Sequence, residues 1–278
     1  MFSHPHKPVE MGALRGMIEG GAVGEALGLP VVGRDAVDLR RSPITEMLGF
    51  GDGVTPGGSV SVCTNSAFDM AHFLLDNEVQ GYTPQRFFQL INSWYLYKVQ
   101  GEDDPLRIIL PSAVVAGCVF SALPTFSIDL AVKSMPDLVC DSVIASASMF
   151  FGASLYLAHG HKPRVAISKA ENLSQRICSE IGLIVGNSGS EAALRRLLDA
   201  FADCFGDGYP AVVLGAVNSG FMPDLAGCLV GSLAGFLSSG SNIPPRWKSL
   251  LRCTDELNYS SEHLYQLMKR VGEGKIGG

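Results

Sequence analysis

Charged residues are scarce in this sequence. Aspartate, glutamate, lysine and arginine make up 17% of the 278 residues, whereas hydrophobic residues make up 47%. Disordered chains combine high charge with few apolar residues, so this composition excludes extensive disorder and predicts a large core. The net charge is −6 at pH 7, and the basic face that nucleic-acid binding normally needs is missing. We therefore expect no nucleic-acid partner.

Long apolar runs are missing as well. Residues 1–8 contain no apolar run behind a basic start, which argues against a signal peptide. The two stretches with few charges, 142–160 and 225–241, are rich in serine and glycine, and the second is poor in the strongly apolar residues that cross a bilayer. We interpret both as buried helices, and expect a cytoplasmic protein with no membrane partner.

Familiar catalytic and metal-binding patterns are also absent. There is no Gly-x-Ser-x-Gly elbow, no Walker loop and no His-Glu-x-x-His pattern. Neither Cys-x-x-Cys nor the Cys–His spacing of a zinc site occurs, so we interpret the cysteines as reduced, buried thiols. The sequence contains seven of them: Cys63, Cys118, Cys140, Cys178, Cys204, Cys228 and Cys253.

The periodicity that is present is helical. Alternation of apolar and polar residues with period two, which is typical of exposed strands, is rare, whereas apolar residues recur at helical spacing in roughly ten segments. Because no linker or repeat interrupts them, we predict one all-α domain over residues 1–278, a compact bundle of many helices. The clearest segments are 66–75, 112–123, 142–159, 165–181, 191–205, 209–217, one after Thr83-Pro84, one opened by Pro223-Asp224 and one capped by Ser260.

Glycine recurs every four residues in two of these segments. Since glycine in a helix costs about 1 kcal/mol relative to alanine, such stripes need a tertiary reason, and close approach of another backbone is the obvious one. The first stripe does not follow a strand, which favours core packing over a phosphate-binding loop. The stripes are Gly12, Gly16, Gly20, Gly24 and Gly28, and then Gly227, Gly231 and Gly235.

Short motifs form an ordered set along the chain. Residues 24–32 read G-E-A-L-G-L-P-V-V, 63–66 read C-T-N-S, 102–111 contain L-R-I, and 216–225 read A-V-N-S-G-F-M-P-D-L before Ile243-Pro244 and Trp247. This set resembles the ADP-ribosylglycohydrolase family, whose motifs read G-D-A-x-G-x-P-x-E, T-D-D-T, N-G-x-x-M-R-I-x-P and A-V-N-x-G-G-D-T-D-T. The resemblance spans roughly residues 12–251 and implies the all-α fold of that family.

The resemblance also implies a site between the second and the last motif. Family members hold two magnesium ions there, which orient the ribose of an ADP-ribosyl group while its glycosidic bond to a protein side chain is hydrolysed. Carried over position by position, the ligand cleft would be formed by Cys63, Thr64, Asn65, Ser66, Asn218, Ser219, Gly220, Met222 and Asp224.

Several of these positions depart from the family's pattern. Thr64 and Asn65 stand in place of two aspartates, Met222 in place of a third, and Leu225 in place of the final threonine. Of the metal-binding carboxylates only Asp224 remains. Magnesium prefers carboxylate oxygens, and two divalent ions about 4 Å apart need several anionic ligands to offset their repulsion. We therefore expect no metal site and no cofactor.

The individual residues also have plain structural interpretations. Asp224 could serve only as a helix-start carboxylate, and Asn65 and Ser66 could be helix N-caps. Asp69 and His72 lie three residues apart and could form an acid–base pair or a local hydrogen bond. The acidic cluster 102–104 could attract a cation or be a solvated loop.

The sequence thus leaves the function open between hypotheses. The leading one is a degenerate glycohydrolase with little or no hydrolase activity, which binds an ADP-ribose-like ligand or a protein partner. The alternative is a divergent, metal-independent hydrolase of N- or O-glycosidic bonds, with acid and base supplied by Asp224, Asp69 or the cluster 102–104. A purely structural protein would follow if side chains fill the cleft between the two motif helices.

Overall fold

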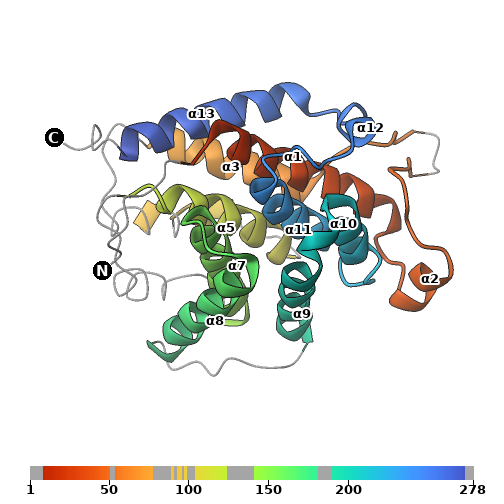
Figure 1. The fold of residues 1–278 in the computed structure, drawn as a ribbon, viewed down its shortest axis with the longest axis horizontal. Helices are drawn as coiled ribbons and strands as arrows, with labels where there is room; N and C mark the ends of the chain where they lie inside the picture. The colour runs from red at the N-terminus through yellow and green to blue at the C-terminus, as the bar shows by residue number, and fades with distance from the viewer. Residues whose placement is uncertain are drawn as a thin grey trace. The chain divides into compact units, whose positions relative to one another are not determined.

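The computed structural model describes residues 9–50, 54–77, 89–90, 93–95, 97–98, 104–123, 141–180 and 189–272. Every regular element in these ranges is a helix (Figure 1), so the predicted all-α fold is confirmed. The chain forms two compact units, one of residues 1–10, 69–192 and 263–278, the other of residues 11–68 and 193–262. The single domain over residues 1–278 stays a prediction. Within the described part of the chain, no helix combines the length and the hydropathy that a membrane crossing requires.

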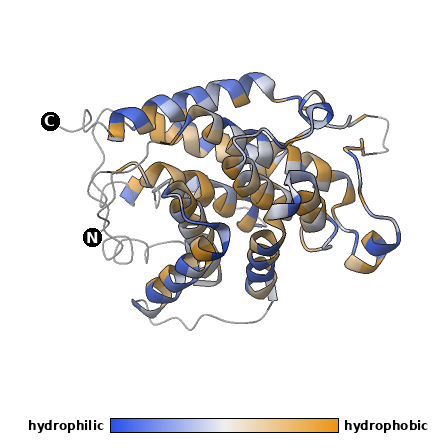
Figure 2. Ribbon diagram, in the orientation of Figure 1, coloured by the Kyte–Doolittle hydropathy of each residue, from blue (hydrophilic) through white to orange (hydrophobic). Residues whose placement is uncertain are grey.

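The first unit is built on three helices of its described part. Its main elements are α5 (Leu106–Phe120), α7 (Asp141–Ala158) and α8 (Pro163–Glu180), and α7 packs against both of the others. From Ile108 onward every residue of α5 is buried, as expected for a helix that is apolar on all sides. In contrast α8 buries only one stripe, and Figure 2 shows hydrophilic residues along the rest of it.

The second unit contains the remaining described helices. They are α1 (Met11–Gly28), α2 (Ala36–Arg41), α10 (Tyr209–Val217), α11 (Pro223–Leu237) and α12 (Pro245–Lys248), with short 3-10 turns at Leu29–Val31 and Phe205–Asp207. The boundary between the units falls within α3 (Val62–Asp76), α9 (Gly189–Cys204) and α13 (Thr254–Gly272). The core of the second unit is the antiparallel pair α1 and α11, which α10 also contacts.

The two glycine stripes explain why α1 and α11 approach so closely. Gly16, Gly20 and Gly24 of α1 lie against Gly235, Gly231 and Gly227 of α11, in that order. A methyl group added to any of these glycines would overlap the carbonyl oxygen of its counterpart. The expectation of close backbone approach is therefore confirmed, and the backbone contact offsets the intrinsic helix cost of glycine.

Three helix starts differ from the prediction by four residues or more. Helix α5 begins at Leu106 and continues through Pro111, whereas the predicted helix began after that proline. Burial of the helix outweighs the loss of one backbone donor at Pro111. Helix α13 begins at Thr254, so Ser260 is a buried residue inside it and not its cap. Helix α3 begins at Val62, four residues before the predicted Ser66.

Some predictions concern residues that lie outside or only partly inside the described ranges. The helix after Thr83-Pro84 is described only at residues 89–90, 93–95 and 97–98, and these are helical. The turn signals at residues 51–53, the N-terminal residues 1–8 and Cys140 lie outside the described residues.

Candidate functional site

Glu25 of α1 caps the N-terminus of α3. Its two carboxylate oxygens accept hydrogen bonds from the backbone amides of Cys63 and Thr64, at 3.1 and 3.0 Å. The first amides of a helix have no partner within the helix, and its N-terminus attracts negative charge, so a carboxylate satisfies both. Glu25 is fully buried. The first and second motifs are therefore joined by a buried side chain, at a position where the family has aspartate.

Burial and hydrogen bonding shift the pKa of Glu25 in opposite directions. Burial raises the pKa of the carboxyl above 4.5, and this is the larger effect. The backbone amides of Ser61, Cys63 and Thr64 favour the ionised form and partly counteract it. The Thr64 hydroxyl also lies close enough to lower this pKa, although Thr64 Oγ1 is buried without a hydrogen-bond partner of regular geometry in the described part of the chain.

The second motif lies within the first turn of α3. Cys63, Thr64 and Ser66 are buried, whereas Asn65 is exposed. The backbone amide of Asn65 donates to the carbonyl of Ser61 at 3.0 Å, which is already a regular helical bond. The suggestion that Asn65 and Ser66 are N-caps is therefore wrong, because the helix begins earlier and a residue of α1 satisfies its first amides.

Cys63 brings the second and last motifs together. Its thiol lies near that of Cys228 on α11, and this neighbouring thiol together with burial raises the pKa of Cys63 well above its ordinary value. The charges of Glu25 and Asp224 act in the same direction. Asp224 is 3% exposed and lies in the first turn of α11. The structure thus gathers two thiols and two carboxylates in the interior between the N-terminal parts of α3 and α11.

The other residues of the last motif shape the loop between α10 and α11. Asn218 forms two hydrogen bonds with Ile44: Oδ1 accepts from the backbone amide at 2.8 Å, and Nδ2 donates to the carbonyl at 2.9 Å. Gly220 has a φ of 78° and packs against Ala36, where a side chain would not fit. The Ser219 hydroxyl is exposed and accepts from the amide of Phe221 at 3.3 Å.

The residues that replace acidic or polar family positions lie at the start of α11. Met222 is the N-cap residue and adopts the left-handed region with φ 40°. Side chains with a Cβ rarely adopt this conformation, which costs on the order of 1 kcal/mol. Leu225 is fully buried in the first turn. Pro223 and Asp224 open the helix, as predicted.

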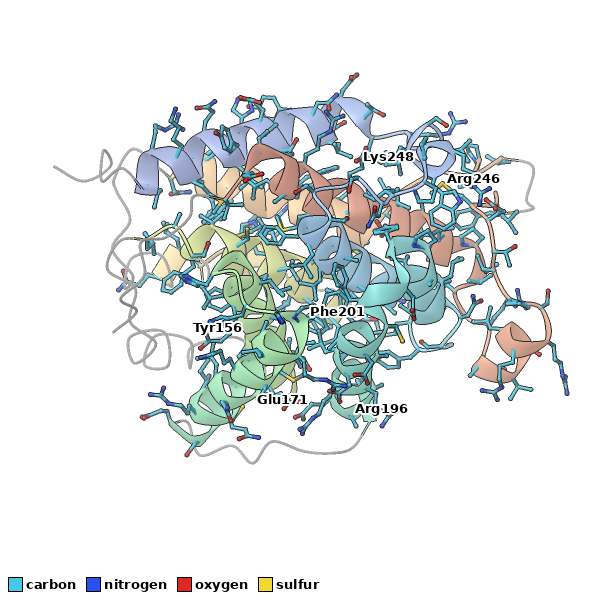
Figure 3. The ribbon with its side chains drawn as sticks, in the orientation of Figure 1. Tyr156, Glu171, Arg196, Phe201, Arg246 and Lys248 are labelled. Atoms are coloured by element: carbon cyan, nitrogen blue, oxygen red, sulfur yellow. The ribbon has the colours of Figure 1, made fainter. Side chains whose placement is uncertain are left out.

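The last part of the family pattern also has a structural role. Trp247 is buried, and its Nε1 donates to Glu46 Oε2 at 2.9 Å. Lys248 Nζ lies 3.0 Å from Glu19 Oε2, so α12 is also joined to α1 by an ion pair. Arg246 forms an ion pair with Glu46; Figure 3 labels Arg246 and Lys248. These contacts fix the Ile-Pro-x-x-Trp segment against α1 and the loop around Glu46, both in the second unit.

The remaining acidic candidates are engaged in ion pairs of the first unit. Asp69 Oδ2 lies 2.6 Å from Lys98 Nζ, and both side chains are partly exposed. Asp104 forms an ion pair with Arg107, and residues 102–103 lie outside the described ranges. These contacts favour the interpretation of both acidic groups as local salt-bridge partners. The pairing of Asp69 with His72 as acid and base stays a prediction.

Glu25 is the site residue to which the sequence assigned no role. It stands within the first motif, where its acidic side chain matches the family's aspartate in charge. Sequence alone could have indicated a buried carboxylate there, because the residue lies within a stripe of glycines on a helix predicted to be buried. Its partners, Cys63 and Thr64, are 38 and 39 residues away and carry no local signal.

Comparisons with known proteins support the resemblance to this family. The sequence profile of the ADP-ribosylglycohydrolase family matches residues 107–274, a range that includes the last motif. No curated protein matches the chain. A solved structure described as an "ADP-ribosylglycohydrolase-related protein complex" is similar with a TM-score of 0.57 and 21% identity, over 93% of this chain and 98% of that one. At this identity the likeness concerns the fold. Because the profile matches more than half of its residues, the chain belongs to the ADP-ribosylglycohydrolase family.

Proposed function

We propose that this chain is a non-hydrolytic member of the family that acts by binding an ADP-ribose-like ligand. The observation that carries the proposal is the use of Glu25: its buried carboxylate bonds the backbone of the second motif and caps a helix. A carboxylate engaged in this way contributes to the scaffold and is not available to offset the charge of metal ions.

The remaining donors suit a pair of magnesium ions poorly. Two such ions bring four positive charges, and hard cations of this kind are normally held by several carboxylates. Asp224 is the further carboxylate whose charge acts on Cys63 beside that of Glu25. Among the described residues, no group of three or more aspartate, glutamate, cysteine or histidine side chains has a metal-binding arrangement. The apolar Leu225 and the thiols of Cys63 and Cys228 lie buried in this region. The residues therefore do not fit the family's two-metal centre.

The last motif is nevertheless held in place by specific contacts. Asn218 holds the segment around Ile44, and Gly220 allows the loop to pass close to α2. A loop held in this way can present backbone groups to a ligand without any metal. This supports retained binding with lost hydrolysis.

The alternative of a metal-independent hydrolase has weaker support. It needs two carboxylates that face one substrate, one as acid and one as base. Asp69 forms an ion pair with Lys98, and Glu25 bonds two amides, so each has a structural use. Asp224 alone supplies one group where two are required.

The proposal is tested by separating turnover from binding. Purified protein is incubated with ADP-ribosylated arginine and serine peptides and magnesium, and released ADP-ribose is measured. We expect none, while isothermal titration calorimetry detects ADP-ribose binding that is the same with magnesium and with EDTA. Turnover that is lost in Asp224→Ala would refute the loss of hydrolysis, and absence of ADP-ribose binding would refute the ligand and favour a protein partner.

A quadruple variant provides a matched control. It combines Thr64→Asp, Asn65→Asp, Met222→Asp and Leu225→Thr, which restore the family's residues at four of the positions that differ. If these four positions account for the loss, the restored protein should gain magnesium-dependent ADP-ribose binding. A wild-type protein that already responds to magnesium to the same extent would contradict the proposal.

A further inference from the structure

A pocket of about 370 Å³ lies in the second unit, and none of Glu25, Cys63 and Asp224 is among its lining residues. Helices α9 and α10 form its walls, with a contribution from α11 and from the loop that follows α10. Of the predicted cleft residues only Ser219 borders it. Pockets for small ligands usually measure about 300–1,000 Å³, so its size suits a small molecule.

The pocket has an apolar interior and a small-residue mouth. Leu197, Phe201, Val212 and Val230 are buried and form the floor. The exposed lining residues Ala200 of α9 and Ala211 and Gly215 of α10 are small and border its open side. Small side chains at these helix positions leave space that larger ones would fill. The apolar lining excludes a strongly polar ligand such as a free sugar, because its hydroxyls would lose water without finding partners.

One charged side chain borders this apolar space. Arg196 is exposed on α9 and has neither a hydrogen bond nor an ion pair with any residue that the structure describes. The neighbouring Arg195 and Asp199 do have interactions. Arg196 is therefore a guanidinium group at the pocket rim that no described residue pairs with. Figure 3 labels Arg196 and Phe201 on the same helix, one at the rim and the other on the floor. A guanidinium group pairs well with carboxylates through two parallel hydrogen bonds.

We infer that this pocket binds a small amphipathic carboxylate, with its apolar chain on the floor of Leu197, Phe201 and Val230 and its carboxylate at Arg196. An apolar cavity lies beside a cation that no described residue neutralises, and such a ligand satisfies both. Ser219, on the loop after α10, offers a hydroxyl as a second polar contact.

Cys204 provides a direct reporter of occupancy. It borders the pocket and is exposed, whereas Cys63, Cys118, Cys178, Cys228 and Cys253 are buried. Cys140 lies outside the described residues, and Cys140→Ser removes it as a competing thiol. Bound ligand should slow the reaction of Cys204 with a maleimide reagent.

The test uses decanoate, octanoate and decanol as probes of the full chain, with calorimetry and Cys204 protection as the two readouts. Decanoate should bind roughly fifteenfold more tightly than octanoate, because it has two more methylenes and each buried methylene strengthens binding about fourfold. Arg196→Gln should weaken decanoate by at least tenfold and leave decanol unchanged. Ala200→Trp, at an exposed position of the mouth, should abolish both. Arg195→Gln, on the same helix but outside the lining, serves as the matched control and should change neither.

Three results would overturn the inference. If decanoate neither binds nor protects Cys204, small amphipathic carboxylates are excluded as ligands of this pocket. Equal weakening by Arg196→Gln and Arg195→Gln shows a general charge effect in place of a pairing at the rim. Concentration-dependent self-association that Ala200→Trp abolishes, measured by light scattering, shows that a second copy of the chain covers the groove. None of these results bears on hydrolysis or on ADP-ribose binding, so this inference and the proposed function can fail separately.

Discussion

The backbone amide of Thr64 donates a 3.0 Å hydrogen bond to the carboxylate of Glu25, which ties the start of α3 to the end of α1. Gly24, the residue before Glu25, contacts Gly227 of α11. Cys228, the residue after Gly227, lies near Cys63 of α3 and raises its pKa. The close contact between Gly24 and Gly227 therefore aligns α1 and α11 along their lengths, so that Glu25 and Cys228 both lie near the start of α3.

Removing the Glu25 carboxylate should destabilise the protein strongly. Glu25→Ala leaves the buried amides of Cys63 and Thr64 without acceptors, and each buried unsatisfied donor costs roughly 1–3 kcal/mol. We expect a loss of about 2–6 kcal/mol in the free energy of unfolding, measured with urea at neutral pH. The matched control is Asp35→Ala, which removes the exposed cap of the short helix α2 and should cost much less, because water can replace the lost acceptor. Equal losses in the two variants would contradict the buried cap.

The stability contributed by Glu25 should fall as pH rises. Burial raises the pKa of its carboxyl above 4.5 in the folded state, so the folded protein binds this proton more tightly than the unfolded chain does. Its contribution is complete below the unfolded pKa and is lost as the pH rises through the folded pKa. Glu25→Gln cannot titrate. The wild type should therefore lose stability relative to Glu25→Gln from about pH 4.5 upward, in urea titrations of both proteins. A relative gain would contradict the raised pKa.

Two glycine-to-alanine variants should have opposite effects. Gly231→Ala places a methyl group on the carbonyl of Gly20, and we expect a loss of about 1–3 kcal/mol or more from overpacking. Gly215→Ala lies in α10 with open space around it, so alanine's helix propensity should increase stability by up to about 1 kcal/mol. Thermal melts and urea titrations measure both. If both variants lost a similar amount of stability, the space around each glycine would not explain the effect of the substitution.

Asn218 should be needed as a paired donor and acceptor. Asn218→Asp keeps an oxygen for the amide of Ile44 but places another oxygen against the carbonyl of Ile44, where Nδ2 donates at 2.9 Å. We expect a loss of about 1–3 kcal/mol from this unpaired carbonyl and the repulsion. Ser219→Ala, next in sequence at an exposed position, should change stability by less than about 0.5 kcal/mol. A tolerated Asn218→Asp would show that the segment around Ile44 does not depend on this pairing.

Magnesium should not stabilise the protein. An ion that binds only the folded state raises the free energy of unfolding by RT ln(1 + [L]/Kd), about 2.7 kcal/mol at a hundred times Kd. With Met222 and Leu225 in place of an aspartate and a threonine, we expect no such gain at millimolar concentrations. Thermal melts with magnesium, calcium, manganese and EDTA should superimpose. A rise in melting temperature of several degrees with magnesium that disappears in Asp224→Asn would contradict this prediction and support a two-metal centre.

The sequence by itself determined the helical class and the order of the motifs. Helical periodicity and the scarcity of alternating strands depend on neighbouring residues, which is why the all-α fold could be predicted without any tertiary information. The glycine stripes likewise required a close backbone neighbour, since their helix cost is a local property. The shared four-residue spacing did not identify which glycine of one stripe packs against which glycine of the other.

Only the tertiary structure decided where the helices begin and what the polar residues do. The start of α3 at Val62 depends on Glu25, 38 residues before Cys63, so no local pattern could indicate it. Asn218 owes its role to Ile44, 174 residues away. The apolar pocket is lined by residues of α9, α10 and α11 that come together only after folding. Hydrogen bonds and cavities join residues that are distant in the chain, whereas periodicity records only how each segment will bury one of its faces.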